Sequence, residues 1–132
     1  MAVYNNKEIN AAVKVLKNNS LALMDGPKVR LLEKSVAKIF GKNYGLMVNS
    51  GSSANLLALA SLNIKKNSEV ITPALTFSTT VAPIIQLGLV PRFIDVEPNK
   101  FVCKTDQIES NITKNTKVLM IPNLLGNLAE WD

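Results

Sequence analysis

Hydrophobic and polar positions along the first third of the chain follow a helical period. Residues 7–17 place Ile9, Val13 and Leu16 at helical spacing between lysines and asparagines, which predicts an amphipathic helix. A second helix is expected to begin after Asp25-Gly26-Pro27, because proline is favoured in a first helical turn. The apolar positions of its expected inner face are Val29, Leu32, Val36, Ile39 and Phe40.

From residue 44 onward, short apolar runs alternate with helical patterns. Strands are predicted over about residues 44–48, 69–73, 89–96 and 117–121, and helices over about 53–62, 78–87 and 106–111. Strands that alternate with helices predict a parallel sheet with right-handed crossovers. The expected fold class is therefore α/β, with three αβα layers around a mostly parallel sheet.

Three of these helices carry more detailed expectations. The helix over residues 53–62 is apolar nearly all round and should lie between layers. Pro83 lies within the next helix and should kink it or confine regular hydrogen bonding to its later part. Thr105 is expected to cap the last helix, with Ile108 and Ile112 facing inward.

Composition adds a size and a set of partners. The 132 residues, 47% hydrophobic and 19% charged, suit one globular domain over 1–132, with a helix and connection over 1–24 and strand–helix units over 25–132. The net charge of +5 comes from scattered lysines and forms no stripe, so nucleic acid is not an expected partner. The mild basic excess suits an anionic metabolite such as a nucleotide.

The residues that the chain lacks exclude several kinds of chemistry. Cys103 is the single cysteine and there is no histidine, which excludes a disulfide framework, a Ser-His-Asp or Cys-His mechanism within this chain and, in practice, a zinc site. The lone cysteine favours the cytoplasm. No signal peptide is expected, and the charge-poor stretches 43–64 and 70–91 are interrupted by polar or helix-breaking residues, so no membrane span is expected either.

Residues 49–53 form a small polar turn between a predicted strand and a predicted helix. Such a helix start offers unpaired N–H groups and the positive end of the helix dipole, which suit a phosphate or another anion. Gly51 would let the backbone approach closely, and Ser50, Ser52 and Ser53 could add hydroxyl groups. Equally, one polar side chain of the turn could simply cap the helix.

Phe77 follows the next predicted strand, in a loop with hydroxyl neighbours. Ligands of open α/β sheets bind beyond the carboxyl ends of the strands, so a phosphate in one loop and an aromatic face in the next suit a flat, phosphorylated heterocycle. Taken alone, Phe77 is better explained by ordinary core packing. Neither a GxGxxG nor a GxxxxGK[ST] sequence is present.

Taken together, these motifs resemble the N-terminal part of the sugar-modifying pyridoxal-phosphate (PLP) enzymes of the DegT family, which have the aspartate aminotransferase fold. The resemblance runs from about Met24 to Asp132. The stretches that carry it are Gly26-Pro27-Lys28-Val29 with Leu32-Glu33, Phe40-Gly41, residues 49–59, Glu69-Val70-Ile71-Thr72-Pro73, Thr76-Phe77, Thr79-Thr80, Gly88-Leu89-Val90-Pro91, Phe93-Ile94-Asp95-Val96 and Leu125-Gly126-Asn127.

The resemblance implies a cofactor and a substrate class. Gly51, Ser52 and Ser53 would bind the PLP phosphate, and Phe77 would stack on the pyridine ring of PLP. Asn123 stands where the 3-dehydrase branch of the family often has a histidine. The wording of the motifs is most similar to the 3-dehydrases, which act on nucleotide-linked 4-keto-6-deoxy sugars, and to related sugar aminotransferases. A nucleotide-sugar partner, a cytoplasmic homodimer and a role in deoxysugar or lipopolysaccharide O-antigen synthesis are implied with it.

The same resemblance implies that the catalytic residues lie outside this sequence. The family's ring-nitrogen aspartate falls beyond Asp132, which is not itself the ring partner, and the Schiff-base lysine or replacing histidine comes later. We therefore expect a truncated part of the PLP-binding domain, inactive alone, with open sheet edges that self-associate. The alternatives are a stand-alone α/β module that binds a phosphorylated metabolite without catalysis, and a remnant without a ligand.

Overall fold

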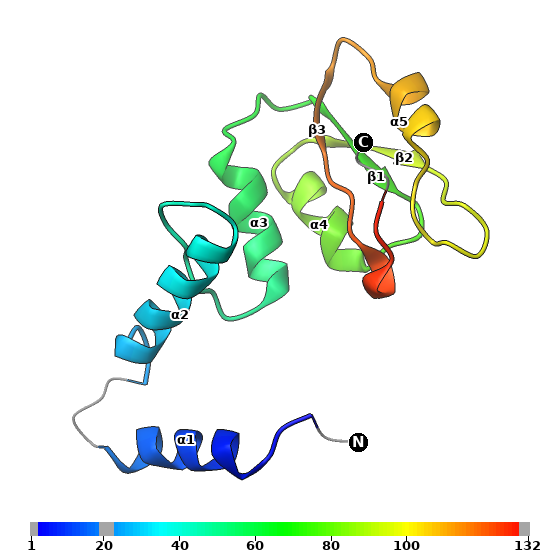
Figure 1. The fold of residues 1–132 in the computed structure, drawn as a ribbon. Helices are drawn as coiled ribbons and strands as arrows, with labels where there is room; N and C mark the ends of the chain where they lie inside the picture. The colour runs from blue at the N-terminus through cyan, green and yellow to red at the C-terminus, as the bar shows by residue number, and fades with distance from the viewer. Residues whose placement is uncertain (1–2, 19–22, 130–132) are drawn as a thin grey trace. The chain divides into compact units, whose positions relative to one another are not determined.

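The computed structural model describes residues 3–18 and 23–129 of the chain. Two compact units divide the chain, residues 1–48 and residues 49–132 (Figure 1). The predicted single domain, with its boundary after residue 24, stays a prediction. None of the described helices combines the length and the apolar composition that a membrane crossing needs.

The first helix of the first unit, α1 (Asn6–Lys17), confirms the sequence prediction. Its start is a capping box, in which Asn5 Oδ1 accepts from the Lys7 N–H at 2.8 Å and the Asn5 N–H donates to Glu8 Oε2 at 2.7 Å. The Asn5 N–H, followed by the N–H of Glu8 itself, lowers the pKa of the Glu8 carboxyl group.

The second helix, α2 (Pro27–Ile39), begins with Pro27 in its first turn, as predicted. The expectation of a buried inner face is wrong, because Leu32, Val36 and Ile39 are all exposed. Ala37 is the buried residue of this helix. A helix of this pattern buries its apolar face only where another element covers it, and the described residues leave that face open.

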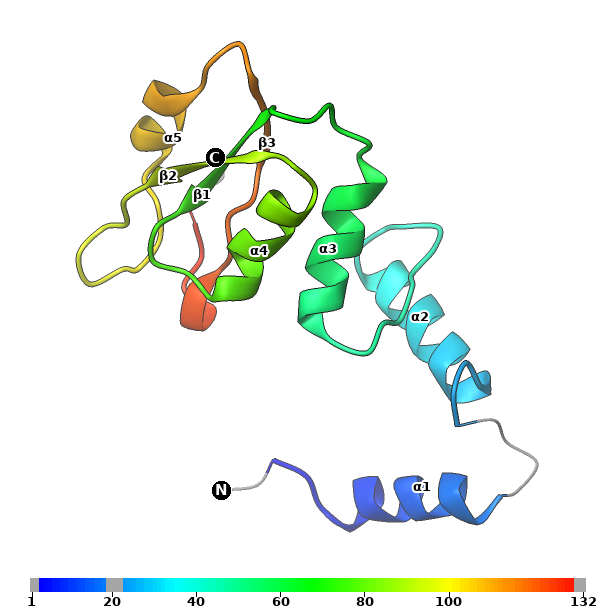
Figure 2. The same cartoon turned by 180° about the vertical axis from the view of Figure 1, so that it is seen from behind.

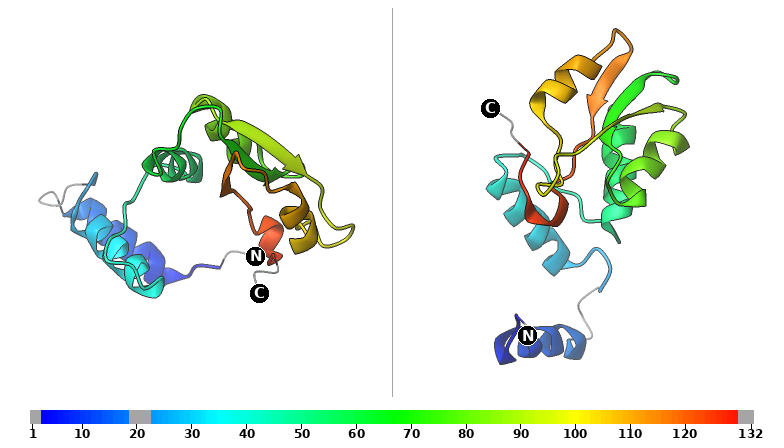
Figure 3. Two further views of the ribbon diagram at one scale, coloured as in Figure 1. Left: turned by 90° about the horizontal axis from the view of Figure 1, so that it is seen from above. Right: turned by 90° about the vertical axis from the view of Figure 1, so that its right-hand side faces the viewer.

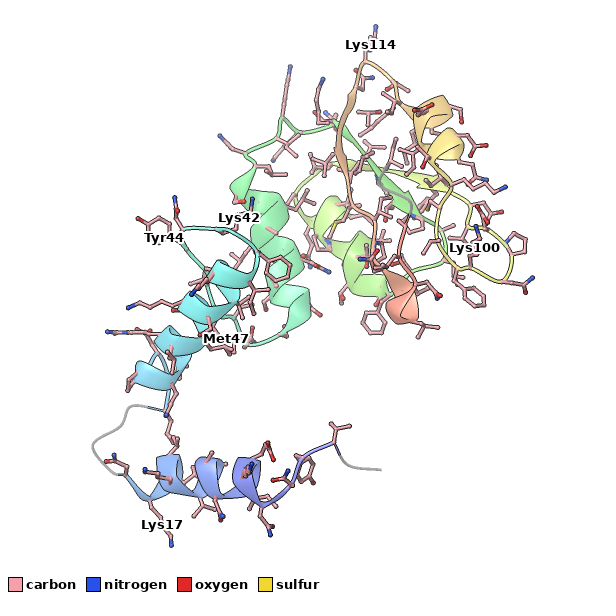
Figure 4. The ribbon with its side chains drawn as sticks, in the orientation of Figure 1. Lys17, Lys42, Tyr44, Met47, Lys100 and Lys114 are labelled. Carbon is pink, nitrogen blue, oxygen red and sulfur yellow. The ribbon has the colours of Figure 1, made fainter. Side chains whose placement is uncertain are left out.

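The strand predicted over residues 44–48 is also wrong, since these residues have no regular secondary structure. A strand needs a neighbouring strand to satisfy its backbone groups. Here the Met47 N–H donates instead to Glu33 Oε1 of α2, at 2.8 Å. Gly45 lies so close to α2 that an added Cβ would stand 2.7 Å from the Glu33 carbonyl oxygen, while Tyr44 and Lys42 project outward (Figure 4).

The second unit is a strand–helix alternation around a three-stranded parallel sheet in the order β2-β1-β3 (Figure 2). The β2 strand contains Pro91, whose missing N–H suits an edge position. The predicted parallel pairing and strand–helix order from residue 69 onward are confirmed. The elements of this unit are α3 (Gly51–Ser61), β1 (Glu69–Pro73), α4 (Ser78–Gln86), β2 (Val90–Ile94), α5 (Thr105–Asn111), β3 (Thr116–Leu119) and the short 3₁₀ helix η1 (Leu124–Gly126).

The central strand β1 is buried on both faces, which creates three layers within this unit. Val70 packs with residues of α3 and α4 on one face, and Ile71 packs with residues of β2 and α5 on the other. Figure 3 shows α3 and α4 on one side of the sheet and α5 on the other. Successive side chains of a strand point to opposite faces, so this apolar strand joins two separate core clusters. The clusters are Leu59, Val70, Ile84 and Leu89, and Ile71, Ile94, Cys103 and Ile108.

Three finer predictions for this unit are wrong. The α3 helix is not enclosed between layers, because Leu59 is buried while Leu57 is exposed. The N-cap of α5 is Lys104, and Thr105 is already the first helical residue. Ile112 is exposed because it follows the end of α5, where the backbone becomes extended and no longer places the side chain above Ile108.

Candidate functional site

Ser50 caps the start of α3. Its backbone is extended, with φ −160° and ψ 159°, and its Oγ accepts from the Ser53 N–H at 3.1 Å. The Ser50 hydroxyl also donates to Ser53 Oγ at 3.2 Å, and the Ser50 carbonyl accepts from the Ala54 N–H at 3.0 Å. The cap interpretation of the turn is therefore correct for Ser50, and one N–H group, that of Ser53, is used for it.

The cap leaves the N–H groups of Gly51 and Ser52 available. The first N–H groups of a helix have no intrahelical acceptor, and no hydrogen bond to these two is formed within the described residues. Ser52 is half-buried, whereas Gly51 is exposed. The positive end of the helix dipole lies at the same place, so the start of α3 can still hold an anion.

The space beside Gly51 is open. An added Cβ at this position would meet no atom within 4 Å, and the backbone is not in the left-handed region. Among the described residues, neither packing nor conformation therefore requires glycine here. Apart from its two chain neighbours, no described side chain fills the space on the Cβ side of Gly51. This fits the predicted cofactor phosphate.

Phe77 is exposed at the carboxyl end of β1, where it is the N-cap residue of α4. Its side chain is 69% exposed, so core packing does not account for it. The turn around it is held by its own bonds: the Thr80 N–H donates to the Phe77 carbonyl at 2.9 Å, and Thr76 Oγ1 donates to Thr80 Oγ1 at 3.0 Å. The ring is thus available to stack against a flat ligand.

A side-chain bond that the sequence reasoning missed joins the two helices of the site. Asn55 Nδ2 donates to the Thr79 carbonyl at 3.2 Å. Beside this bond is an open hollow of about 180 Å³ that Ser52 and Ser53 enter from α3, whereas neither Gly51 nor Phe77 lines it. The lining residues are Ser52, Ser53, Leu56, Thr79, Ala82, Pro83 and Gln86.

Asn123, which the resemblance places where the 3-dehydrase branch often has a histidine, takes part in a local turn. Its Oδ1 accepts from the Ala129 N–H at 3.3 Å, and its carbonyl accepts from the Gly126 N–H at 3.2 Å. Leu125 within this turn has φ 56°, in the left-handed region. Across residues 3–18 and 23–129, no three histidine, cysteine, aspartate or glutamate side chains gather as metal ligands would.

Comparison with known proteins gives consistent likenesses over almost the whole chain. The model of the DegT/DnrJ/EryC1/StrS aminotransferase family matches residues 3–132. The GDP-4-keto-6-deoxy-D-mannose 3-dehydratase of Yersinia pseudotuberculosis is 38% identical over 99% of this chain and 34% of its own length. The chain thus spans about a third of the length of the curated relatives it matches.

Solved structures agree with these sequence likenesses. The E. coli GDP-4-keto-6-deoxy-D-mannose-3-dehydratase with bound hydrated PLP matches with a TM-score of 0.86 and 35% identity, over 96% of this chain and 33% of that one. A putative sugar aminotransferase from Streptococcus pneumoniae in its PMP form matches with a TM-score of 0.81 and 28% identity, over 95% and 31%. These structures confirm the predicted fold class.

Proposed function

Because the chain belongs to the DegT/DnrJ/EryC1/StrS aminotransferase family, we propose that the start of α3 and Phe77 form one wall of a PLP site. The open helix start supports this most directly. Ser50 takes the Ser53 N–H for the cap, while the N–H groups of Gly51 and Ser52 form no hydrogen bond within the described residues and the space beside Gly51 is open. A purely structural cap would account for Ser50 and leave the glycine at position 51 unexplained.

Each residue of this wall has a binding task. The N–H groups of Gly51 and Ser52 donate to the phosphate, and the hydroxyl groups of Ser52 and Ser53 add further donors at the positive end of the α3 dipole. The exposed ring of Phe77 stacks on the pyridine ring. When bound, PLP supplies an electron sink for chemistry next to a carbonyl or amine carbon. We assign no catalytic residue to this chain, and we propose that its 132 residues are inactive alone.

The reaction proposed for the whole protein follows from the substrates named for its relatives. The substrate is a nucleotide-linked 4-keto-6-deoxy sugar. The reaction is either loss of the sugar's C3 hydroxyl group or transfer of an amine to the sugar. Such a reaction belongs to deoxysugar or lipopolysaccharide O-antigen synthesis, in the cytoplasm, by a homodimer. Sequencing the DNA that follows the Asp132 codon tests this proposal. A lysine codon at the Schiff-base position supports an aminotransferase, and a histidine codon supports a 3-dehydrase.

Cofactor binding is tested with pyridoxamine 5′-phosphate (PMP), which cannot form Schiff bases with the surface lysines. The protein for this test is the product of the complete reading frame that carries this sequence, called the parent protein below. We expect it to bind PMP, measured by equilibrium dialysis. Ser52→Ala removes one hydroxyl donor to a charged phosphate and should weaken binding about tenfold. Phe77→Ala removes the stacked ring and should weaken binding about fivefold.

Ser61→Ala is the matched control, because Ser61 lies at the opposite end of the same helix and its hydroxyl donates to the Ala58 carbonyl at 2.7 Å. PMP affinity should be unchanged in this variant. If the parent protein does not bind PMP, or if Ser61→Ala weakens binding as much as Ser52→Ala does, the assignment of the wall is wrong. If Ser52→Ala weakens PMP binding but Phe77→Ala leaves it unchanged, the result would favour a module that binds a different phosphorylated metabolite.

A further inference from the structure

Pro83 leaves a carbonyl group of α4 without its helical donor. In an α-helix the carbonyl of residue 79 accepts from the N–H of residue 83, but Pro83 has no N–H. Pro83 and Thr79 both lie within α4, in its buried or half-buried part. A carbonyl in such a place needs another donor, because an unpaired buried polar group costs folding free energy.

Asn55 of α3 supplies that donor. Its Nδ2 lies 3.2 Å from the Thr79 carbonyl oxygen, in a half-buried place between the two helices. Asn55 stands three residues after Ser52 on the phosphate side of the site, and Thr79 stands two residues after Phe77 on the ring side. This hydrogen bond therefore connects α3, on the phosphate side, to the first turn of α4, on the ring side.

The helices α3 and α4 share the core cluster of Leu59, Val70, Ile84 and Leu89, but Phe77 is not part of it. The turn that carries Phe77 is closed by its own bonds, from the Thr80 N–H to the Phe77 carbonyl and from Thr76 to Thr80. These bonds hold the turn together without setting its distance from α3. The Phe77 side chain is largely exposed, and the bond from Asn55 joins α3 to Thr79, two residues from Phe77, whereas Ile84 of the shared cluster lies seven residues from it. The bond therefore acts closer to the ring than the shared packing does.

We propose that Asn55 is a positioning residue, which uses the carbonyl freed by Pro83 to hold the ring-stacking turn in place relative to the phosphate-binding helix start. Asn55 itself touches neither phosphate nor ring. This proposal rests on the proposed PLP site, and it adds to that site a residue that sets the spacing of its two contacts.

The test compares PMP affinity and folding stability in four proteins: the parent, Asn55→Leu, Pro83→Ala and the double variant. Leucine resembles asparagine in shape but lacks the donor, so Asn55→Leu should weaken PMP binding about fivefold. Pro83→Ala restores the N–H that Thr79 needs. In that background Asn55→Leu should cost much less stability, because the carbonyl keeps a donor, while PMP binding should still weaken because the connection to α3 is lost.

Asn111→Leu is the matched control, since Asn111 Nδ2 donates to the Gln107 carbonyl at 2.9 Å inside α5. It should leave PMP affinity unchanged. Parent-like affinity in Asn55→Leu would overturn the proposal and leave the PLP site intact. The proposal would also be overturned if the double variant regained both the PMP affinity and the stability that Asn55→Leu had lost, because Asn55 would then act through folding alone.

A ligand-free measurement separates failure of the connection from failure of the PLP site. In the NMR spectrum without PMP, Asn55→Leu should shift the backbone amide signals of Phe77, Ser78 and Thr79, while Asn111→Leu should not. If the parent protein does not bind PMP, the proposed function fails, and these shifts still decide whether Asn55 fixes the turn. Unmoved signals at residues 77–79 would overturn the connection as well.

Discussion

The two units of the chain contain similar helices but bury very different amounts of apolar surface. In the described part of residues 1–48, Ala37 is the one buried hydrophobic residue. In residues 49–129, ten buried hydrophobic residues include two clusters on opposite faces of β1. Both regions have the amphipathic patterns of core-forming segments, so the pattern alone does not create a core.

The difference shows which forces act in each unit. The α1 helix has a capping box at Asn5 and Glu8, and α2 has Pro27 in its first turn; these are local signals that specify a helix without burial. In the second unit, each element covers an apolar face of its neighbour. Most of a helix's stability in a folded protein comes from such packing, so the second unit should be far more resistant to unfolding.

The strongest test of this comparison replaces one isoleucine in each unit. Ile71→Ala removes a fully buried side chain from β1 and should lower the free energy of unfolding of residues 49–129 by about 3–4 kcal/mol. Ile39→Ala, at a position that is 77% exposed, should change stability by less than about 0.5 kcal/mol. Denaturant titration measures the loss of unfolding free energy in both variants, with amide exchange of β1 as a second readout. Equal losses would refute the contrast in burial.

A smaller effect is expected where the first unit does have close packing. In Gly45→Ala the new Cβ would stand 2.7 Å from the Glu33 carbonyl, so residues 43–47 must move away from α2, at a cost of about 1–3 kcal/mol. The Met47 amide, which is bonded to Glu33, should then exchange faster with solvent. Lys42→Ala, at an exposed neighbouring position, is the control; a Met47 amide that is equally protected in all three proteins would show that this packing is not present in solution.

The smallest effect is a pH dependence of α1. The Asn5 N–H lowers the pKa of Glu8 in the folded state, so the stabilisation is present above the carboxyl group's unfolded pKa and is lost as pH falls through its folded pKa. The helical NMR shifts of α1 should therefore weaken on acidification, and Glu8→Gln should remove much of that dependence. An α1 titration that is unchanged in Glu8→Gln would assign it to another group.

The sequence predicted most accurately the elements that pair or pack with a neighbouring element in the structure. Residues 69–73 were predicted as a buried strand with the bounds that β1 has, because an apolar run with strands on both sides is stable as a strand. Residues 44–48 have a similar apolar pattern but no adjacent strand among the described residues, so they form none. Pairing is a property of two segments, and a single-segment pattern cannot supply it.

The site was predictable to the same extent. A helix start at the polar turn of residues 49–53 and the aromatic residue after β1 followed from local sequence, although α3 begins at Gly51 and not at about residue 53 as predicted. The roles of Gly51, Ser52, Ser53 and Phe77 in cofactor binding stay a prediction. The bond from Asn55 to Thr79 was missed because it depends on how two helices pack. Its signal was nevertheless in the sequence: Pro83, four residues after Thr79, removes the donor that this carbonyl would otherwise have.

Cys103 makes the opening of the second unit chemically measurable. It is the single cysteine of the chain, it is buried beside Ile71, Ile94 and Ile108, and burial, followed by the negative charge of Asp95, raises the pKa of its thiol. A thiol reagent therefore reacts with it when this cluster separates. Labelling of the unaltered chain thus reports how often residues 49–132 open, while the first unit, which has no cysteine, contributes nothing to the signal.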